Sequence, residues 1–241
     1  MGLKILNISN EMSIVISQDK PIWGIWHLEE NHTLAYFQDH FSWTDEENTA
    51  LDKISHPAKK LQKLAARACL KQLVPELKHY PILNDGEGRP YIINNPNSFL
   101  SLSHSDRLAG FIYSNDKIVA LDIERIDSGR SLKVAKMFMN DEELQQLNKL
   151  NDIRYFYLLW CVKECLFKIL NYSIHEISFQ RHLYTLTTDT EFHLYSKGSI
   201  FVGCKRSDLT FESIAYYYQW NDYMVAYMEV DPIKIGLRNK I

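Results

Sequence analysis

Acidic side chains at two places in the sequence are spaced so that they could meet. Asp122 and Glu124 end an apolar run that starts at Ile118, and a strand would place both carboxylates on one face. Glu164 and Lys168 follow about forty residues later and share a face of a helix, because they are four residues apart. Carboxylate oxygens suit Mg2+, and a lysine beside them suits a phosphate. The pattern indicates magnesium-assisted phosphoryl transfer.

Both parts of this pattern also have simpler interpretations. An Asp-x-Glu pair is commonly a solvated pair at the edge of a strand. Glu164 and Lys168 could form an ordinary surface pair worth roughly 0.3–0.5 kcal/mol. The apolar residues before Asp122 favour a buried strand, whose carboxyl end is a common place for a ligand. The helix around Glu164 is so apolar that its charged residues lie either on a single solvent-exposed face or in a pocket. The residues alone are compatible with both positions.

Composition and charge limit the classes of protein that fit. The chain has 241 residues, enough for one large or two small domains, and its net charge of -3 does not favour a polyanion-binding protein. Its four cysteines form no C-x-x-C pair, which argues against a zinc knuckle or a thioredoxin motif. No signal peptide and no membrane-spanning run is recognisable. We therefore expect a reduced, cytoplasmic protein that contacts neither membrane nor nucleic acid.

The expected elements fall into two similar halves. Helices are predicted from Pro57 to about Val74 and over 152–170, and capping boxes at 44–47 and 140–143 open shorter helices. Strands are expected at 22–28, 90–93, 99–103, 108–114, 118–123, 191–195, 200–204, 213–218 and 223–230, with a short helix near 132–139. Residues 1–20 read as an extension or an edge strand. The prediction is a mixed α/β (α+β) fold with two pseudo-symmetric subdomains, 1–115 and 116–241.

Several cationic or polar residues in the first half could bind an anion. The segment from Lys53 to Pro75 has six basic and no acidic side chains, and Arg67 lies beside the apolar stripe of its helix. Arg89 follows a glycine turn, which is usually turn chemistry alone but beside a phosphate would supply a bidentate clamp. Ser103 and His104 follow an apolar strand, where a hydrogen-bonded loop role is common and a phosphate contact is chemically reasonable. A serine hydrolase fits poorly, since G-x-S-x-G is absent.

Four motifs in this order resemble the 4'-phosphopantetheinyl transferases, in particular the larger, surfactin-synthetase-activating type with two pseudo-symmetric halves. The motifs are Gly88-Arg89-Pro90, Leu100 to Ser105, Ala120 to Glu124, and Trp160 to Lys168. Ala120 stands where the family usually has Gly, and Leu100-Ser101 stands where it has Phe-Asn. The resemblance implies an enzyme of the holo-[acyl-carrier-protein] synthase type. It would move 4'-phosphopantetheine from coenzyme A to a serine of an apo acyl or peptidyl carrier protein and release adenosine 3',5'-bisphosphate.

The resemblance also implies roles for individual residues. The predicted Mg2+ ligands are Asp122, Glu124 and Glu164, the catalytic residues are Glu164 and Lys168, and the residues that bind coenzyme A are Arg67, Arg89, Ser103, His104 and Lys168. Lys59 or Lys60 is a weaker candidate for the 3'-phosphate. Lys168 would neutralise charge on the transferred phosphate. Glu164 would deprotonate the carrier serine, directly or through a water.

A carrier protein and two alternative functions complete the predictions. Carrier proteins are typically acidic, so Lys133 and Lys136 are candidates for the docking contact, with Met137 or Phe138 as an apolar anchor. Two halves in one chain could build a whole site, so we expect a monomer. A coenzyme A-binding module without catalysis and a magnesium-dependent phosphohydrolase are the alternatives.

Overall fold

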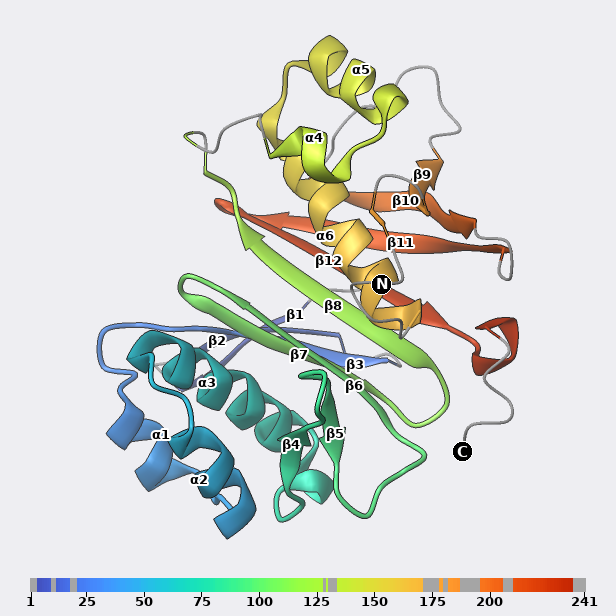
Figure 1. The fold of residues 1–241 in the computed structure, drawn as a ribbon. Helices are drawn as coiled ribbons and strands as arrows, with labels where there is room; N and C mark the ends of the chain where they lie inside the picture. The colour runs from blue at the N-terminus through green and yellow to red at the C-terminus, as the bar shows by residue number, and fades with distance from the viewer. Residues whose placement is uncertain are drawn as a thin grey trace. The chain divides into compact units, whose positions relative to one another are not determined.

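The computed structural model divides the chain into two compact units (Figure 1). It describes residues 4–9, 12–17, 21–127, 129, 134–170, 178–179, 182–186, 196–205 and 210–235. Unit 1 comprises Met1–Val119 and unit 2 comprises Ala120–Arg238. The division lies inside a strand, four residues after the predicted boundary at residue 115.

Unit 1 is an antiparallel five-stranded sheet with helices on it. Its strands are β1 (Lys4–Ser9), β2 (Met12–Ser17), β3 (Ile22–His27), β6 (Phe99–Ser105) and β7 (Leu108–Ser114), and the order across the sheet is β1-β2-β3-β7-β6. The helices are α1 (Leu34–His40), α2 (Asp45–Asp52), α3 (Pro57–Leu73) and the short 3-10 helix η1 (Pro75–Leu77), and a small hairpin joins β4 (Ile82–Asn84) to β5 (Pro90–Ile92). Residues 1–20 thus include two paired strands, where the sequence predicted at most one.

The long helix α3 is fixed both by its own sequence and by the sheet beneath it. Pro57 occupies the first turn, where its missing N–H costs nothing, and the His56 side chain accepts from the Lys59 amide. The apolar face packs on β7, β3 and β6. Gly24 on β3 permits this approach, because a β-carbon there would lie 2.5 Å from Cδ1 of Leu73.

Unit 2 repeats the plan of a sheet beneath one long helix. The sheet order is β8-β12-β11-β10-β9, with β8 (Ile118–Arg125), β9 (Leu183–Leu186), β10 (Lys197–Lys205), β11 (Thr210–Trp220) and β12 (Tyr223–Val230). Its helices are α4 (Ala135–Phe138), α5 (Asp141–Leu150), α6 (Ile153–Leu170) and the 3-10 helix η2 (Pro232–Ile235). Helix α6 packs mainly on β12, and Figure 1 shows it lying across that sheet beside β8.

The predicted fold class is confirmed, and most elements lie where the sequence placed them. Both capping boxes form, at Thr44–Glu47 and Asn140–Glu143, and both long helices match within one residue of their predicted ends. Helix α4 is shorter than predicted, and the predicted strand at 191–195 lies outside the described residues. Strand β9 was not predicted. None of the described helices is long and apolar enough to cross a membrane.

Candidate functional site

Strand β8 and helix α6 place Asp122 against Lys168 in unit 2. The Lys168 Nζ lies 2.8 Å from Oδ1 of Asp122 and donates to the Leu121 carbonyl at 2.7 Å. Asp122 is 6% exposed and the Lys168 side chain is 27% exposed, so the carboxylate is shielded from water and the lysine is partly accessible. The lysine therefore pairs with the strand and not, as a surface pair would, with Glu164 four residues earlier on its own helix. Of the predicted meeting of the two motifs, the ion pair between Asp122 and Lys168 is present.

Glu124, two residues further along β8, is held by the same helix. The indole Nε1–H of Trp160 donates to Oε1 of Glu124 at 3.1 Å. Trp160, Glu164 and Lys168 are spaced by four residues on α6, so one face of the helix meets the acidic end of β8. This contact to Trp160 was not predicted. Its only signal in the sequence is the i, i+4 spacing to Glu164.

The electrostatics of Glu164 reflect the carboxylates around it. Burial, together with the charges of Asp122 and Glu124, raises the pKa of Glu164 to about 7, although Lys168 opposes the rise. For Lys168, burial lowers the pKa, but Asp122 and its other anionic neighbours outweigh it, so the pKa is raised overall. The four side chains therefore form one interacting cluster: three acids and a lysine that stays charged.

The cluster has the donor chemistry of a magnesium site. Within the described residues, no three His, Cys, Asp or Glu side chains are grouped closely enough to hold a metal ion. Asp122, Glu124 and Glu164 are nevertheless near enough for the first two to raise the pKa of the third. A divalent cation would relieve that repulsion, and oxygen donors are what Mg2+ prefers. The three carboxylates thus have the chemistry that Mg2+ requires, although they are not grouped closely enough to coordinate it as they stand.

Lys163, which precedes Glu164, does not join the cluster. Its ammonium is fully buried and forms an ion pair with Glu143 of α5 at 2.5 Å. On the other side of α6, Cys161 and Cys165 are buried against carbonyls of β12, where both side chains pack in the core. The two neighbouring residues therefore differ in role: Lys163 is a buried structural cation, and Glu164 belongs to the acidic cluster.

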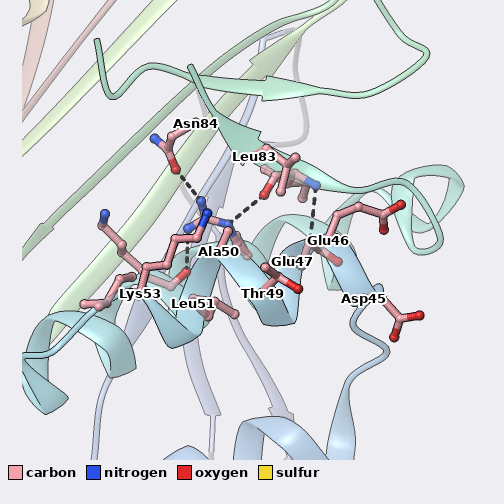
Figure 2. Close-up of a pocket in the computed structure, with 13 residues that line it drawn as sticks. Asp45, Glu46, Glu47, Thr49, Ala50, Leu51, Lys53, Leu83 and Asn84 are labelled. Atoms are coloured by element: carbon pink, nitrogen blue, oxygen red, sulfur yellow. Dashed lines mark hydrogen bonds between the residues drawn. The ribbon is translucent and has the colours of Figure 1, made fainter. Parts of the chain in front are cut away.

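In unit 1, a cleft of about 620 Å³ lies between α2, α3 and β4 (Figure 2). Arg67 is one of the residues that line it. Its guanidinium donates to the Ile82 carbonyl at 3.2 Å, to the Lys63 carbonyl at 3.1 Å and to Oδ1 of Asn84 at 2.7 Å. Arg67 is 4% exposed, and all three acceptors are neutral. Arg67 stays a predicted anion ligand, because it is a buried arginine on a cleft and no carboxylate is among these acceptors.

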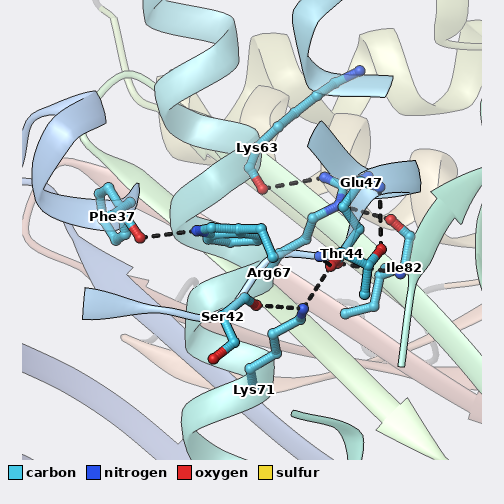
Figure 3. Close-up of polar contacts among 9 residues, drawn as sticks. Phe37, Ser42, Thr44, Glu47, Lys63, Arg67, Lys71 and Ile82 are labelled. Atoms are coloured by element: carbon cyan, nitrogen blue, oxygen red, sulfur yellow. Dashed lines mark hydrogen bonds and ion pairs between the residues drawn. The ribbon is translucent and has the colours of Figure 1, made fainter. Parts of the chain in front are cut away.

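The lining of this cleft carries both signs of charge. Its cationic side chains are Lys53, Lys63 and Arg67, and its acidic ones are Asp45, Glu46 and Glu47. Burial, together with Arg67 and Lys59, lowers the pKa of Lys63. Of the acidic residues, Glu47 is buried and forms an ion pair with Lys71 at 2.7 Å (Figure 3).

The other predicted residues of unit 1 lie apart from this cleft. Arg89 follows Gly88, whose φ of 87° favours glycine, and forms an ion pair with Glu87 on the same turn. Ser103 and His104 lie on β6 opposite Gly110 and Ala109 of β7. None of Arg89, Ser103 and His104 lines the cleft that Arg67 lines. Asn84, which fixes Arg67, was missed because its role depends on a contact across seventeen residues.

The predicted carrier-docking residues divide by exposure. Met137 is 75% exposed and Lys136 is also exposed on α4. Phe138 is 2% exposed and packs on Phe156 and Trp160, so its predicted role as an exposed anchor is wrong. Neighbouring residues of a helix point about 100° apart, so Met137 faces outward while Phe138 faces the core. Lys133 lies outside the described residues.

Comparison with known proteins identifies the segment that holds the acidic cluster. No curated protein matches the chain. A family model does match residues 118–227, which run from the first residue of β8 into β12 and include Asp122, Glu124, Glu164 and Lys168. This segment, close to the whole of unit 2, matches the 4'-phosphopantetheinyl transferase superfamily.

Proposed function

We propose that this protein is a magnesium-dependent 4'-phosphopantetheinyl transferase of the larger, surfactin-synthetase-activating type. It would transfer the 4'-phosphopantetheine group of coenzyme A to a serine of an apo acyl or peptidyl carrier protein. The observation behind this proposal is the cluster of Asp122, Glu124, Glu164 and Lys168, which lies inside the segment that matches the superfamily. Simple binding of coenzyme A would not require three interacting carboxylates.

Each member of the cluster has a role that its surroundings support. Asp122, Glu124 and Glu164 would hold Mg2+, which when bound neutralises charge on the pyrophosphate of coenzyme A. Lys168 has two acceptors among the described residues, so one N–H of its ammonium is available to an oxygen of the transferred phosphate. Phosphoryl transfer depends chiefly on such positioning and charge neutralisation.

The chemical step is a displacement at the phosphorus that carries pantetheine. The carrier serine oxygen forms a bond to this phosphorus, the bond to the second phosphate breaks, and adenosine 3',5'-bisphosphate leaves. The serine proton passes to Glu164, directly or through a water.

Residues of unit 1 would hold the rest of coenzyme A. Arg67, Arg89, Ser103 and His104 are proposed for its other phosphates or the adenosine. Arg67 has the strongest support, since it is a buried cation on a cleft. Arg89 would have to exchange its contact with Glu87 for a phosphate, and both side chains are exposed enough to move.

The carrier would dock on the exposed part of α4. Lys136 offers a positive charge to an acidic carrier, and Met137 offers an apolar contact. Replacing Lys136 by glutamate should raise the KM for the carrier several-fold and leave the KM for coenzyme A unchanged. An unchanged carrier KM would place docking elsewhere.

The decisive experiment is intact-mass analysis of apo carriers after incubation with the protein, coenzyme A and Mg2+. A panel of fatty-acid and peptide-synthetase carriers should gain one phosphopantetheine on at least one member, and Glu164→Gln should abolish the gain. Bound coenzyme A with every carrier left apo would favour a binding module instead. Cleavage of coenzyme A with no modified carrier would indicate a hydrolase.

A further inference from the structure

Among the described residues, each unit has one buried Glu–Lys pair, and the two pairs share the same local setting. In unit 1, Glu47 is the third residue of α2 and closes a capping box with Thr44, and it pairs with Lys71 of α3 (Figure 3). In unit 2, Glu143 is the third residue of α5, closes a capping box with Asn140, and pairs with Lys163 of α6. All four side chains of the two pairs are at most 4% exposed.

The correspondence extends to two further contacts of each pair. Lys71 also donates to the carbonyl of Ser42, two residues before the N-cap of α2, at 2.9 Å. Lys163 likewise donates to the carbonyl of Phe138, two residues before the N-cap of α5, at 2.9 Å. The second oxygen of each glutamate accepts from the strand that follows the long helix, at Ile82 in unit 1 and at Thr185 in unit 2. The buried ion pair thus connects the short capped helix to the long helix in both units, α2 to α3 and α5 to α6.

The two pairs differ in what surrounds the lysine. Three residues before Lys163 stands Trp160, and the residue after it is Glu164. The same offsets from Lys71 give Ala68 and Gln72. Trp160 and Glu164 therefore connect the unit 2 pair to the cluster of Asp122, Glu124, Glu164 and Lys168, and Lys71 has no Trp or Glu at the same offsets.

In unit 2 the lysine also organises an aromatic clamp. Lys163 Nζ donates to the carbonyls of Phe138 and Phe179, at 2.9 Å and 3.4 Å. The rings of the same two residues contact the indole of Trp160: Phe138 edge-on with centroids 5.0 Å apart, and Phe179 stacked at 6.2 Å. The indole N–H then donates to Glu124 at 3.1 Å. A continuous series of contacts therefore runs from the buried pair to a carboxylate of the cluster.

We propose that the Glu143–Lys163 pair and Trp160 are positioning residues, which hold the Glu124 carboxylate in the orientation that a divalent cation requires. The pair fixes the two phenylalanines, the phenylalanines fix the indole, and the indole orients the carboxylate. The Glu47–Lys71 pair likewise joins its short helix to its long helix, but it orients no carboxylate of the cluster. This inference rests on the proposed function, because it assigns the cation site to the acidic cluster.

Three variants separate positioning from stability. Trp160→Phe keeps a ring in the clamp and removes only the donor to Glu124. The double variant Glu143→Gln/Lys163→Met removes the buried pair without leaving one charge alone, and glutamine still closes a capping box. Its matched control is Glu47→Gln/Lys71→Met in unit 1. Equilibrium unfolding by urea reports stability, and loss of the free-ion electron paramagnetic resonance signal reports Mn2+ binding without turnover.

We expect both double variants to lower stability and only one of them to weaken cation binding. The dissociation constant for Mn2+ should rise roughly tenfold in Trp160→Phe and in the unit 2 double variant, as is typical when a residue that orients a metal ligand is lost. It should stay unchanged in the unit 1 double variant. Equal effects of the two double variants on Mn2+ binding would overturn the inference.

A second readout needs neither cation nor activity. The indole N–H resonance of Trp160, identified by its absence in Trp160→Phe, should move in the unit 2 double variant and stay in place in the unit 1 double variant. If the chemical shift of this resonance is the same in both double variants as in the wild type, the positioning role of the Glu143–Lys163 pair is disproved, even if the protein transfers phosphopantetheine. If the wild type binds no Mn2+ and modifies no carrier, the proposed function fails, and the assignment of the clamp to a cation site fails with it.

Discussion

Replacing Glu164 by glutamine should make the protein more stable while removing its proposed activity. Burial and the charges of Asp122 and Glu124 raise the pKa of Glu164 from 4.5 to about 7. The folded protein therefore holds this carboxyl proton more tightly than the unfolded chain does. Ionising the group opposes folding, and glutamine has nearly the same shape without the charge.

The size of the effect follows from the difference between the two pKa values. A difference of about 2.5 corresponds to about 3 kcal/mol once the group is ionised in both states. Glu164 keeps partial exposure, and solvent screening reduces the expected gain to about 2 kcal/mol. For an acid whose folded pKa is raised, the wild type loses this free energy as the pH rises from about 4.5 to about 7.

Urea unfolding in a chelating buffer measures the prediction. At about pH 8, Glu164→Gln should exceed the wild type in free energy of unfolding by about 2 kcal/mol, and at about pH 5 the gain should fall below about 1 kcal/mol. Glu142→Gln, an exposed position on α5, is the matched control and should change stability by less than about 0.5 kcal/mol. A Glu164→Gln variant with equal stability gains at both pH values, or with none, would refute the reasoning about the cluster.

Three further outcomes test the fold and the site. Gly24→Val should cost about 1–3 kcal/mol in urea unfolding, because its side chain would overlap Leu73, and Gly86→Ala, which has no atom nearby, should be tolerated far better. Lys168→Met should lower kcat for carrier modification by roughly 10²–10³ with an unchanged circular dichroism spectrum, since it removes the cation beside the transferred phosphate; near-normal turnover would exclude that role. Arg67→Gln should raise the KM for coenzyme A more than the KM for the carrier, and a rise in the carrier KM alone would remove Arg67 from coenzyme A binding.

Much of this protein could be predicted from local sequence. The capping boxes, the proline that opens α3 and the apolar run of β8 act over a few residues, so their outcomes can be predicted without knowledge of the fold. The spacing of Trp160, Glu164 and Lys168 likewise fixes their common face, because helix geometry is regular. The convergence of Asp122 with Lys168 could be inferred from chemistry and is confirmed as an ion pair.

Tertiary contacts decided what neighbouring residues do. Lys163 and Glu164 are adjacent and look equivalent in the sequence, yet a rotation of about 100° around α6 sends one to a buried partner and the other to the acidic cluster. Phe138 and Met137 divide in the same way between core and surface. The pKa of Glu164 likewise depends on charges forty residues away in the chain. Sequence determined which groups are present and which share a face; only packing determined which of them are buried, paired or left to react.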